Sequence, residues 1–127
     1  MGQQQLLLIL LTVILVGLTI VIGIVISNVY STDSNRTSMI SELNNMGSQA
    51  RKYYLETTQL GGGNQSFTGW TIPPGMVQTG SGNYTATVTP QMITIVGTGI
   101  KTGNNGVGNV QLTNYITFAK DSIVINN

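Results

Sequence analysis

Residues able to carry acid–base or nucleophilic chemistry are few in this chain of 127 residues, which has four carboxylates and neither Cys nor His. The two absences exclude thiol catalysis, disulfides, zinc sites with Cys or His ligands and His-dependent triads. Asp33, Glu42 and Glu56 fall in one predicted helix, too widely spaced for a catalytic pair. Asp121 follows Lys120 in a predicted turn, and the Ser and Thr hydroxyls have no evident base to activate them. We therefore expect no enzymatic activity, no metal and no cofactor.

Glycine-rich and aromatic segments offer two other kinds of candidate site. Gly61-Gly62-Gly63 lacks the Lys and the Ser or Thr of a phosphate-binding loop. No helix pattern follows Gly97-Thr98-Gly99, which argues against a dinucleotide site. Four aromatic residues are candidates for a carbohydrate platform, although core or interface packing is the commoner role of such side chains. These four are Tyr53, Tyr54, Trp70 and Tyr84.

Charge is scarce, at 7% of the residues with a net charge of +1, whereas average usage is ~25%. A nucleic-acid partner is not expected, because binding phosphates needs a basic face. Something other than charge must keep this protein ordered or dispersed.

An apolar run from Leu6 to Ile26 precedes every charged side chain. As a helix, its 21 residues would extend about 31 Å, enough to cross the hydrocarbon core of a bilayer. Thr12 and Thr19 interrupt the run without spoiling it, because a helical Thr can bond a carbonyl one turn back. A cleaved secretory signal is disfavoured, since a charged n-region and a small-x-small site after the run are both missing. Two interpretations remain: a retained single-pass anchor, or a helix that leaves the membrane and packs with copies of itself.

Helical character continues beyond the apolar run as an amphipathic segment. Apolar residues recur there at steps of four and three, which predicts one stripe on a helix. We expect this stripe to pack on the C-terminal part of the chain, and a partner helix is the alternative. The stripe is Met39, Leu43, Met46, Ala50 and Tyr53.

Charged residues of the amphipathic segment mostly fall beside that stripe. Lys52 and Glu56 are four residues apart and so able to pair. Arg36, Glu42, Arg51 and Lys52 are candidates for polar contacts between subunits, with a solvated face as the default role. The run Leu60-Gly61-Gly62-Gly63 is expected to end the helix. A single helix from about Gln3 to about Gln59 would be ~85 Å long, a length that suits a membrane-to-surface spike or a fibre.

Residues after Gly63 read as short strands separated by Gly- and Pro-containing turns. We expect a small antiparallel sheet of about four strands, which alone is marginally stable and needs the helix stripe on one face. The expected strands are 84–89, 92–96, 115–119 and 122–125, with 110–112 either beginning the third or standing separately. Three Asn-x-Ser/Thr sequences make Asn35, Asn64 and Asn83 candidates for glycosylation.

The order of these parts resembles the type IV pilins over the whole chain. The start Met1-Gly2-Gln3-Gln4-Gln5-Leu6-Leu7-Leu8 resembles the glycine and hydrophobic start of a class III signal, after which a dedicated peptidase of that family cuts. Met1 and Gln3 are thus two alternatives for the assembled N-terminus. Three family features are absent: a basic leader before Gly2, the first-turn acidic residue, and the proline common in the apolar half of bacterial pilins. At the position of the acid, Gln5 can offer only a hydrogen bond.

The resemblance implies an α+β, pilin-like fold with a long N-terminal helix, apolar then amphipathic, and a small C-terminal antiparallel sheet. The implied parts are 1–27 as membrane span and filament core, 28–60 as amphipathic half-helix and 61–127 as β domain. The implied function is a structural subunit that self-assembles into an extracellular filament on the cell surface. Its implied partners are further copies of itself, the membrane before assembly and the pilus assembly machinery. The implied filament-core residues are Leu6, Leu7, Leu10, Ile14, Gly17, Val21, Gly23 and Ile24.

The main alternative is a single-pass, membrane-anchored β module that binds an extracellular ligand such as a glycan. A minor pseudopilin of a secretion machine and a filamentous virus coat are more distant alternatives.

Overall fold

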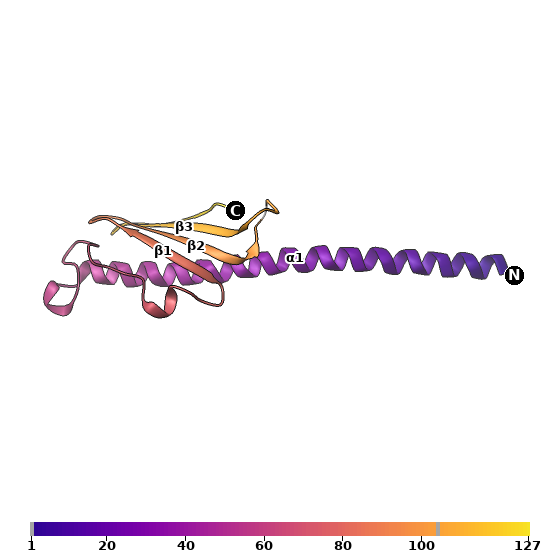
Figure 1. Ribbon diagram of the computed structural model, residues 1–127, viewed down its shortest axis with the longest axis horizontal. Coiled ribbons are helices and arrows are strands. Elements are labelled where there is room, and N and C mark those ends of the chain that lie inside the picture. The colour runs from indigo at the N-terminus through magenta and orange to yellow at the C-terminus, as the bar shows by residue number, and fades with distance from the viewer. Residues whose placement is uncertain (1, 104) are drawn as a thin grey trace. The chain divides into compact units, whose positions relative to one another are not determined.

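The computed structural model describes residues 2–103 and 105–127 and contains one long helix and one sheet. The helix α1 (Gly2–Leu55) is followed by the short 3-10 helices η1 (Thr58–Leu60) and η2 (Pro74–Met76). The strands are β1 (Gly82–Val88), β2 (Ile93–Thr102), β3 (Asn109–Ile116) and β4 (Asp121–Ile125). They form one antiparallel sheet in the order β1-β2-β3-β4 (Figure 1). The predicted α+β class, with a long N-terminal helix and a small C-terminal antiparallel sheet, is confirmed.

The chain divides into two compact units, Met1–Ser31 and Thr32–Asn127. The first is called the apolar segment below, and the second is called the helix–sheet body. Part of α1 therefore belongs to the same body as the strands.

All four strands differ from their predicted bounds. β1 runs from Gly82 to Val88 rather than over 84–89, and β4 begins at Asp121, which the sequence placed in a turn. The larger differences are in β2 and β3. β2 continues through Gly97 and Gly99 to Thr102, well past the predicted end at residue 96. β3 begins at Asn109, so 110–112 open the third strand. The strand ends at Ile116 rather than at 119 because Thr117 closes a turn: its N–H and hydroxyl both donate to the Lys120 carbonyl oxygen, at 2.8 and 3.1 Å.

The helix ends at Leu55, before the predicted end near Gln59 and the glycine run that follows it. The following loop folds back and its backbone N–H groups donate to the last carbonyl oxygens of the helix, as a C-terminal cap requires. Gly63 donates to Tyr53 at 2.8 Å and Gln65 donates to Tyr54 at 2.7 Å. A Cβ at Gly63 would overlap the Ser66 carbonyl oxygen. The glycine run therefore permits the capping loop rather than marking the last helical turn.

The core of the helix–sheet body lies between α1 and the inner face of the sheet. Alternate residues of the strands point toward the helix, as the period of two dictates. Each fully buried aliphatic or aromatic side chain contributes ~1.5–3 kcal/mol. The buried apolar residues are Met39, Leu43, Met46, Ala50, Phe67, Trp70, Tyr84, Ile93, Ile95, Val110, Leu112 and Ile116, with Tyr53 half-buried beside them.

Glycine allows the helix and the sheet to approach closely. A Cβ at Gly97 would lie 2.8 Å from the Tyr84 ring and 2.9 Å from Met39 Cε. On the helix, a Cβ at Gly47 would overlap Asp121 Oδ2. That carboxylate pairs with Arg51, Nη2 to Oδ2 at 3.1 Å. Gly97 therefore makes room for core side chains, and Gly47 makes room for an ion pair between α1 and β4.

We predict that Gly47→Ala lowers the free energy of unfolding by about 1 kcal/mol, because overpacking costs ~1–3 kcal/mol and outweighs the ~1 kcal/mol gain in helix propensity. Chemical denaturation of the full chain in detergent, followed through the single, buried Trp70, measures it. Ser48→Ala, at the exposed neighbouring position, is the control and should not destabilise. In an Asp121→Ala background the obstacle is gone, so Gly47→Ala should become neutral or stabilising. Destabilisation of equal size in both backgrounds would contradict the proposed overlap.

Candidate functional site: the apolar segment

The apolar segment is helical from Gly2 onward, and its large apolar side chains are exposed. Those from Leu6 to Ile26 are each 52–68% exposed. The most apolar 18-residue window of α1 has a mean hydropathy of 3.2, and within the described residues α1 is the helix long and apolar enough to cross a membrane. An exposed apolar surface of this extent marks an interaction site in a protein that functions in water. The segment is therefore compatible with membrane anchoring or with filament assembly.

Polar groups within this helix are satisfied locally. The Thr12 hydroxyl donates to the Leu8 carbonyl oxygen and the Thr19 hydroxyl to that of Leu15, both at 2.8 Å. These are the one-turn-back bonds expected from the sequence. Both hydroxyl groups therefore have a hydrogen-bond acceptor even in an apolar environment.

The predicted filament-core residues form a stripe with two flanking positions. Six of them recur at alternating steps of three and four, the spacing with which helices pack side by side. Gly17 interrupts this stripe with a flat spot, and nothing lies within 4 Å of a Cβ built there or at Gly23. The stripe is Leu7, Leu10, Ile14, Gly17, Val21 and Ile24, and the flanking residues are Leu6 and Gly23.

Glu42, on α1, accepts hydrogen bonds from two residues that lie far along the chain. Thr79 Oγ1 donates to Glu42 Oε2 at 2.9 Å, and the Tyr84 hydroxyl donates to the same oxygen. Burial of the Tyr84 ring raises the pKa of its hydroxyl above the ordinary value, and the Glu42 carboxylate raises it further. This contact was not predicted from the sequence, because nothing in the spacing links residues 42 and 84.

Other charged side chains pair within the body. Lys52 and Glu56 are paired as their spacing predicts, at 3.7 Å. Arg36 Nη1 lies 3.0 Å from Asp33 Oδ1, and Arg36 is buried rather than solvated. In residues 2–103 and 105–127, groups of three or more acidic side chains able to hold a metal ion are absent. The Arg36–Asp33 pair joins residues of α1, whereas the Arg51–Asp121 pair connects α1 to β4.

The aromatic candidates for a carbohydrate platform lie in or against the core. Trp70 is 7% exposed and Tyr84 is 2% exposed. The Tyr53 hydroxyl donates to the Thr68 carbonyl oxygen at 2.8 Å. Tyr54 packs between Phe67 and Phe118, with ring centroids 4.8 and 5.2 Å away. A shallow hollow borders Trp70 and β1, but the four rings do not form an open stacking surface.

The three candidate glycosylation residues differ in accessibility. Asn35 is buried, its side-chain nitrogen donates to the Ser81 carbonyl oxygen at 2.8 Å, and its oxygen accepts from the Lys101 N–H at 3.4 Å. Asn64 and Asn83 are exposed. Since a glycan is attached through the side-chain nitrogen, modification of Asn35 would require this buried side chain to become exposed.

Comparison of the chain with protein-family models, with curated proteins and with solved structures gave no match. The pilin-like resemblance therefore stays a prediction from the sequence.

The raised pKa of Tyr84 predicts a loss of stability in base. The folded state holds this proton more tightly than the unfolded state, so the contribution is complete below the unfolded pKa of about 10 and is lost as the pH rises above it. Between pH 10 and 12, we expect the unfolding free energy of Tyr84→Phe to fall less steeply than that of the native chain, by at most ~1.4 kcal/mol per pH unit. Glu42→Gln should keep most of the native slope, because burial is the larger cause. Equal slopes for Tyr84→Phe and the native chain would disprove the assignment.

Proposed function

We propose that this chain is the structural subunit of an extracellular helical filament, similar in kind to a type IV pilus. In this proposal, the apolar segment holds the subunit in the membrane before assembly and then packs with the apolar segments of other copies. The helix–sheet bodies form the outer layer, and a pilus-type assembly machinery extracts and adds the subunits. The observation that carries the proposal is the exposed apolar helical segment at the N-terminal side of a small, charge-poor body.

Exposure of the apolar segment to water is energetically prohibitive. Burying one Leu or Ile side chain is worth ~1.5–3 kcal/mol, and the large apolar side chains from Leu6 to Ile26 are all more than half exposed. A bilayer covers these apolar side chains when the chain is present as a single copy. Outside a bilayer only other copies supply enough apolar surface, and a contact between unlike faces that does not close on itself produces an open fibre.

The composition of the helix favours packing between copies over simple anchoring. An anchor needs only hydropathy, and because nearly every residue of this run is apolar, the glycine on the six-residue stripe ending at Ile24 is the more specific sign of helix packing. Gly17 on this stripe permits close approach of a neighbouring backbone. The first turn of α1 has no acidic residue, so assembly in this proposal depends on apolar contact and not on the first-turn acidic side chain of the pilin family.

A membrane-anchored β module that binds a glycan is the alternative. It requires an accessible recognition surface, and the aromatic side chains that suit a sugar best are taken up by the core. The packing of these rings therefore favours the filament over the glycan-binding module.

Negative-stain microscopy of material sheared from cells tests the proposal. We expect long fibres composed of this polypeptide. Ile14→Asp should abolish them, because a carboxylate at a packed helix interface is an unpaired buried charge. Ile14→Leu is the matched control and should leave the fibres intact.

Membrane fractionation keeps the test informative. One Asp costs ~2.5–3.5 kcal/mol at the centre of a membrane span, which the many apolar residues of this segment offset, so Ile14→Asp should still be recovered in the membrane. Normal fibres from Ile14→Asp, or a native chain recovered only as a detergent-soluble monomer, would contradict a filament built on this segment.

A further inference from the structure

The end of β2 and the turn that follows it carry two exposed aliphatic side chains, Ile100 on the strand and Val107 in the turn. Ile100 is 58% exposed and Val107 is 76% exposed. Between them lie the exposed residues Lys101 and Thr102. These four residues are called the β2–β3 tip below. Turns in water are usually polar, so an aliphatic side chain held outward in this turn, with a second one exposed on the adjoining end of β2, is unusual.

The β2–β3 tip is held in place by hydrogen bonds and is not a frayed end. The Gly103 N–H donates to the Gly108 carbonyl oxygen at 3.0 Å. The Asn127 side-chain nitrogen donates to the carbonyl oxygens of Val107 and Asn109, both at 3.1 Å. Val107 also donates its N–H to Asn105 Oδ1 at 2.8 Å. The backbone therefore fixes the outward position of Val107.

Charge at the β2–β3 tip is positive. Residues 100–109 include Lys101 and no acidic residue. Asp33 is the acidic side chain nearest along the neighbouring helix, and it is paired with Arg36 at 3.0 Å. A surface that combines aliphatic side chains with an exposed cation suits an anionic lipid headgroup layer, where apolar burial and electrostatic attraction act together.

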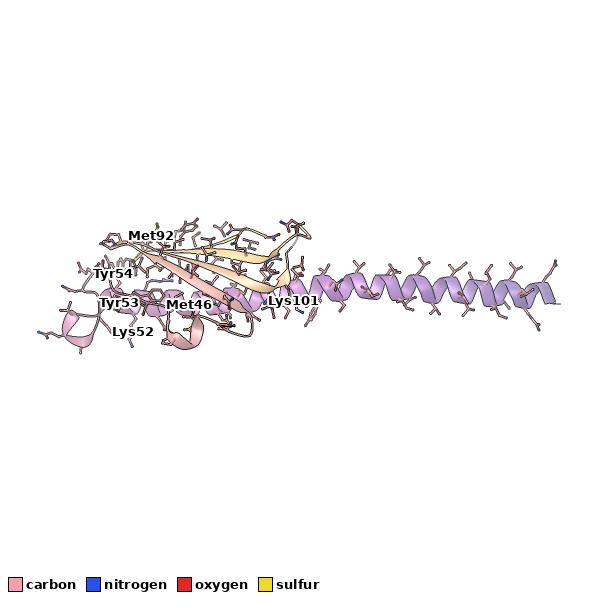
Figure 2. All side chains as sticks on the ribbon, viewed as in Figure 1. Met46, Lys52, Tyr53, Tyr54, Met92 and Lys101 are labelled. Atoms are coloured by element: carbon pink, nitrogen blue, oxygen red, sulfur yellow. The ribbon has the colours of Figure 1, made fainter. Side chains whose placement is uncertain are left out.

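The β2–β3 tip lies at the end of the helix–sheet body where the chain joins the apolar segment. β2 runs antiparallel to the packed part of α1, since Gly97 lies against Met39 and Gly99 against Asn35. At the end of the strand, the Thr32 hydroxyl donates to the Thr102 carbonyl oxygen at 3.0 Å. Figure 2 shows Lys101 at this end of the sheet, with Lys52, Tyr53, Tyr54 and Met92 at the other.

Thr32, at this end of the helix–sheet body, is only a few residues along the chain from the end of the apolar run. Thr32 follows Ile26, the last residue of the apolar run, by six residues, which is about 9 Å in a helix. The headgroup region on each side of a bilayer is ~5–7 Å thick. Tyr30, exposed near the end of the apolar segment, is a residue type that favours this region. When the apolar segment spans a bilayer, Thr102 therefore lies within reach of the headgroups.

We propose that the β2–β3 tip is a membrane-surface contact, with Ile100 and Val107 inserted among the headgroups and Lys101 bound to anionic lipid. The contact restrains the helix–sheet body against the membrane before assembly and is released when the subunit enters the filament. The proposal rests on the membrane stage of the proposed function.

Lipid quenching in vesicles tests this contact. The chain has no Cys, so Val107→Cys, Leu60→Cys and Val16→Cys each accept one environment-sensitive thiol fluorophore. Leu60 is the matched control because it is also 76% exposed but lies beyond the other end of the packed helix, ~35 Å along the helix from Thr32. The full chain is placed in vesicles of phosphatidylcholine and phosphatidylglycerol at low protein density, with nitroxide quenchers on either the headgroup or the acyl chain.

We expect acyl-chain quenching at position 16, headgroup quenching at position 107 and neither at position 60. Lys101→Gln should weaken the contact at position 107 about fivefold on anionic vesicles, the effect of one cation near such a surface, and leave it unchanged on phosphatidylcholine alone.

The outcomes separate this contact from the filament proposal. Quenching at position 16 with none at 107 overturns the membrane contact and leaves the filament standing. A label at 107 that is shielded only as protein density rises, without lipid quenching, identifies a second copy as the occupant and also overturns the contact. No quenching at either position overturns both the contact and the membrane stage.

Discussion

The apolar segment imposes the constraint on which the rest of this protein depends. Its large side chains from Leu6 to Ile26 are more than half exposed in a single copy, and the segment contains no charged residue. Each of these side chains costs free energy in water until lipid or another protein surface covers it. One isolated copy of the chain in water would therefore expose this segment at a large cost in free energy. The low overall charge is consistent with a molecule that is always covered by something apolar along this segment.

The helix–sheet body solves a different problem, that of making a stable unit from a small sheet. The apolar face of the sheet must be covered by another element, so the second half of α1 forms the other layer of the core. The layers come close because glycine stands where Cβ atoms would collide, at Gly47 on the helix and at Gly97 on β2. Hydrogen bonds and an ion pair then fix the position of the helix on the rest of the body. Tyr84 and Thr79 donate to Glu42, and Arg51 pairs with Asp121.

The sequence predicted the features that local pattern controls. Helical periodicity placed the stripe from Met39 to Tyr53, alternation placed the strands, and hydropathy delimited the apolar segment. It missed features that depend on residues far apart in the chain. A local rule treats Gly97 as a break in the strand. β2 extends past Gly97 because the close neighbour of this glycine is the helix. The helix ends at Leu55 because a later loop caps its carbonyl oxygens. Asn35 is buried, although its local sequence matches that of an exposed glycosylation acceptor.

The most direct test of the central claim is hydrogen–deuterium exchange over residues 2–31 in sheared, detergent-free assemblies, with the phospholipid content of the same sample measured as phosphate. If copies of the apolar segment cover one another, amides of this segment should exchange more slowly than those of the exposed β1 residues, in a sample essentially free of lipid. Rapid exchange over 2–31, or protection found only where phospholipid accompanies the protein in quantity, would contradict a filament core built from this helix.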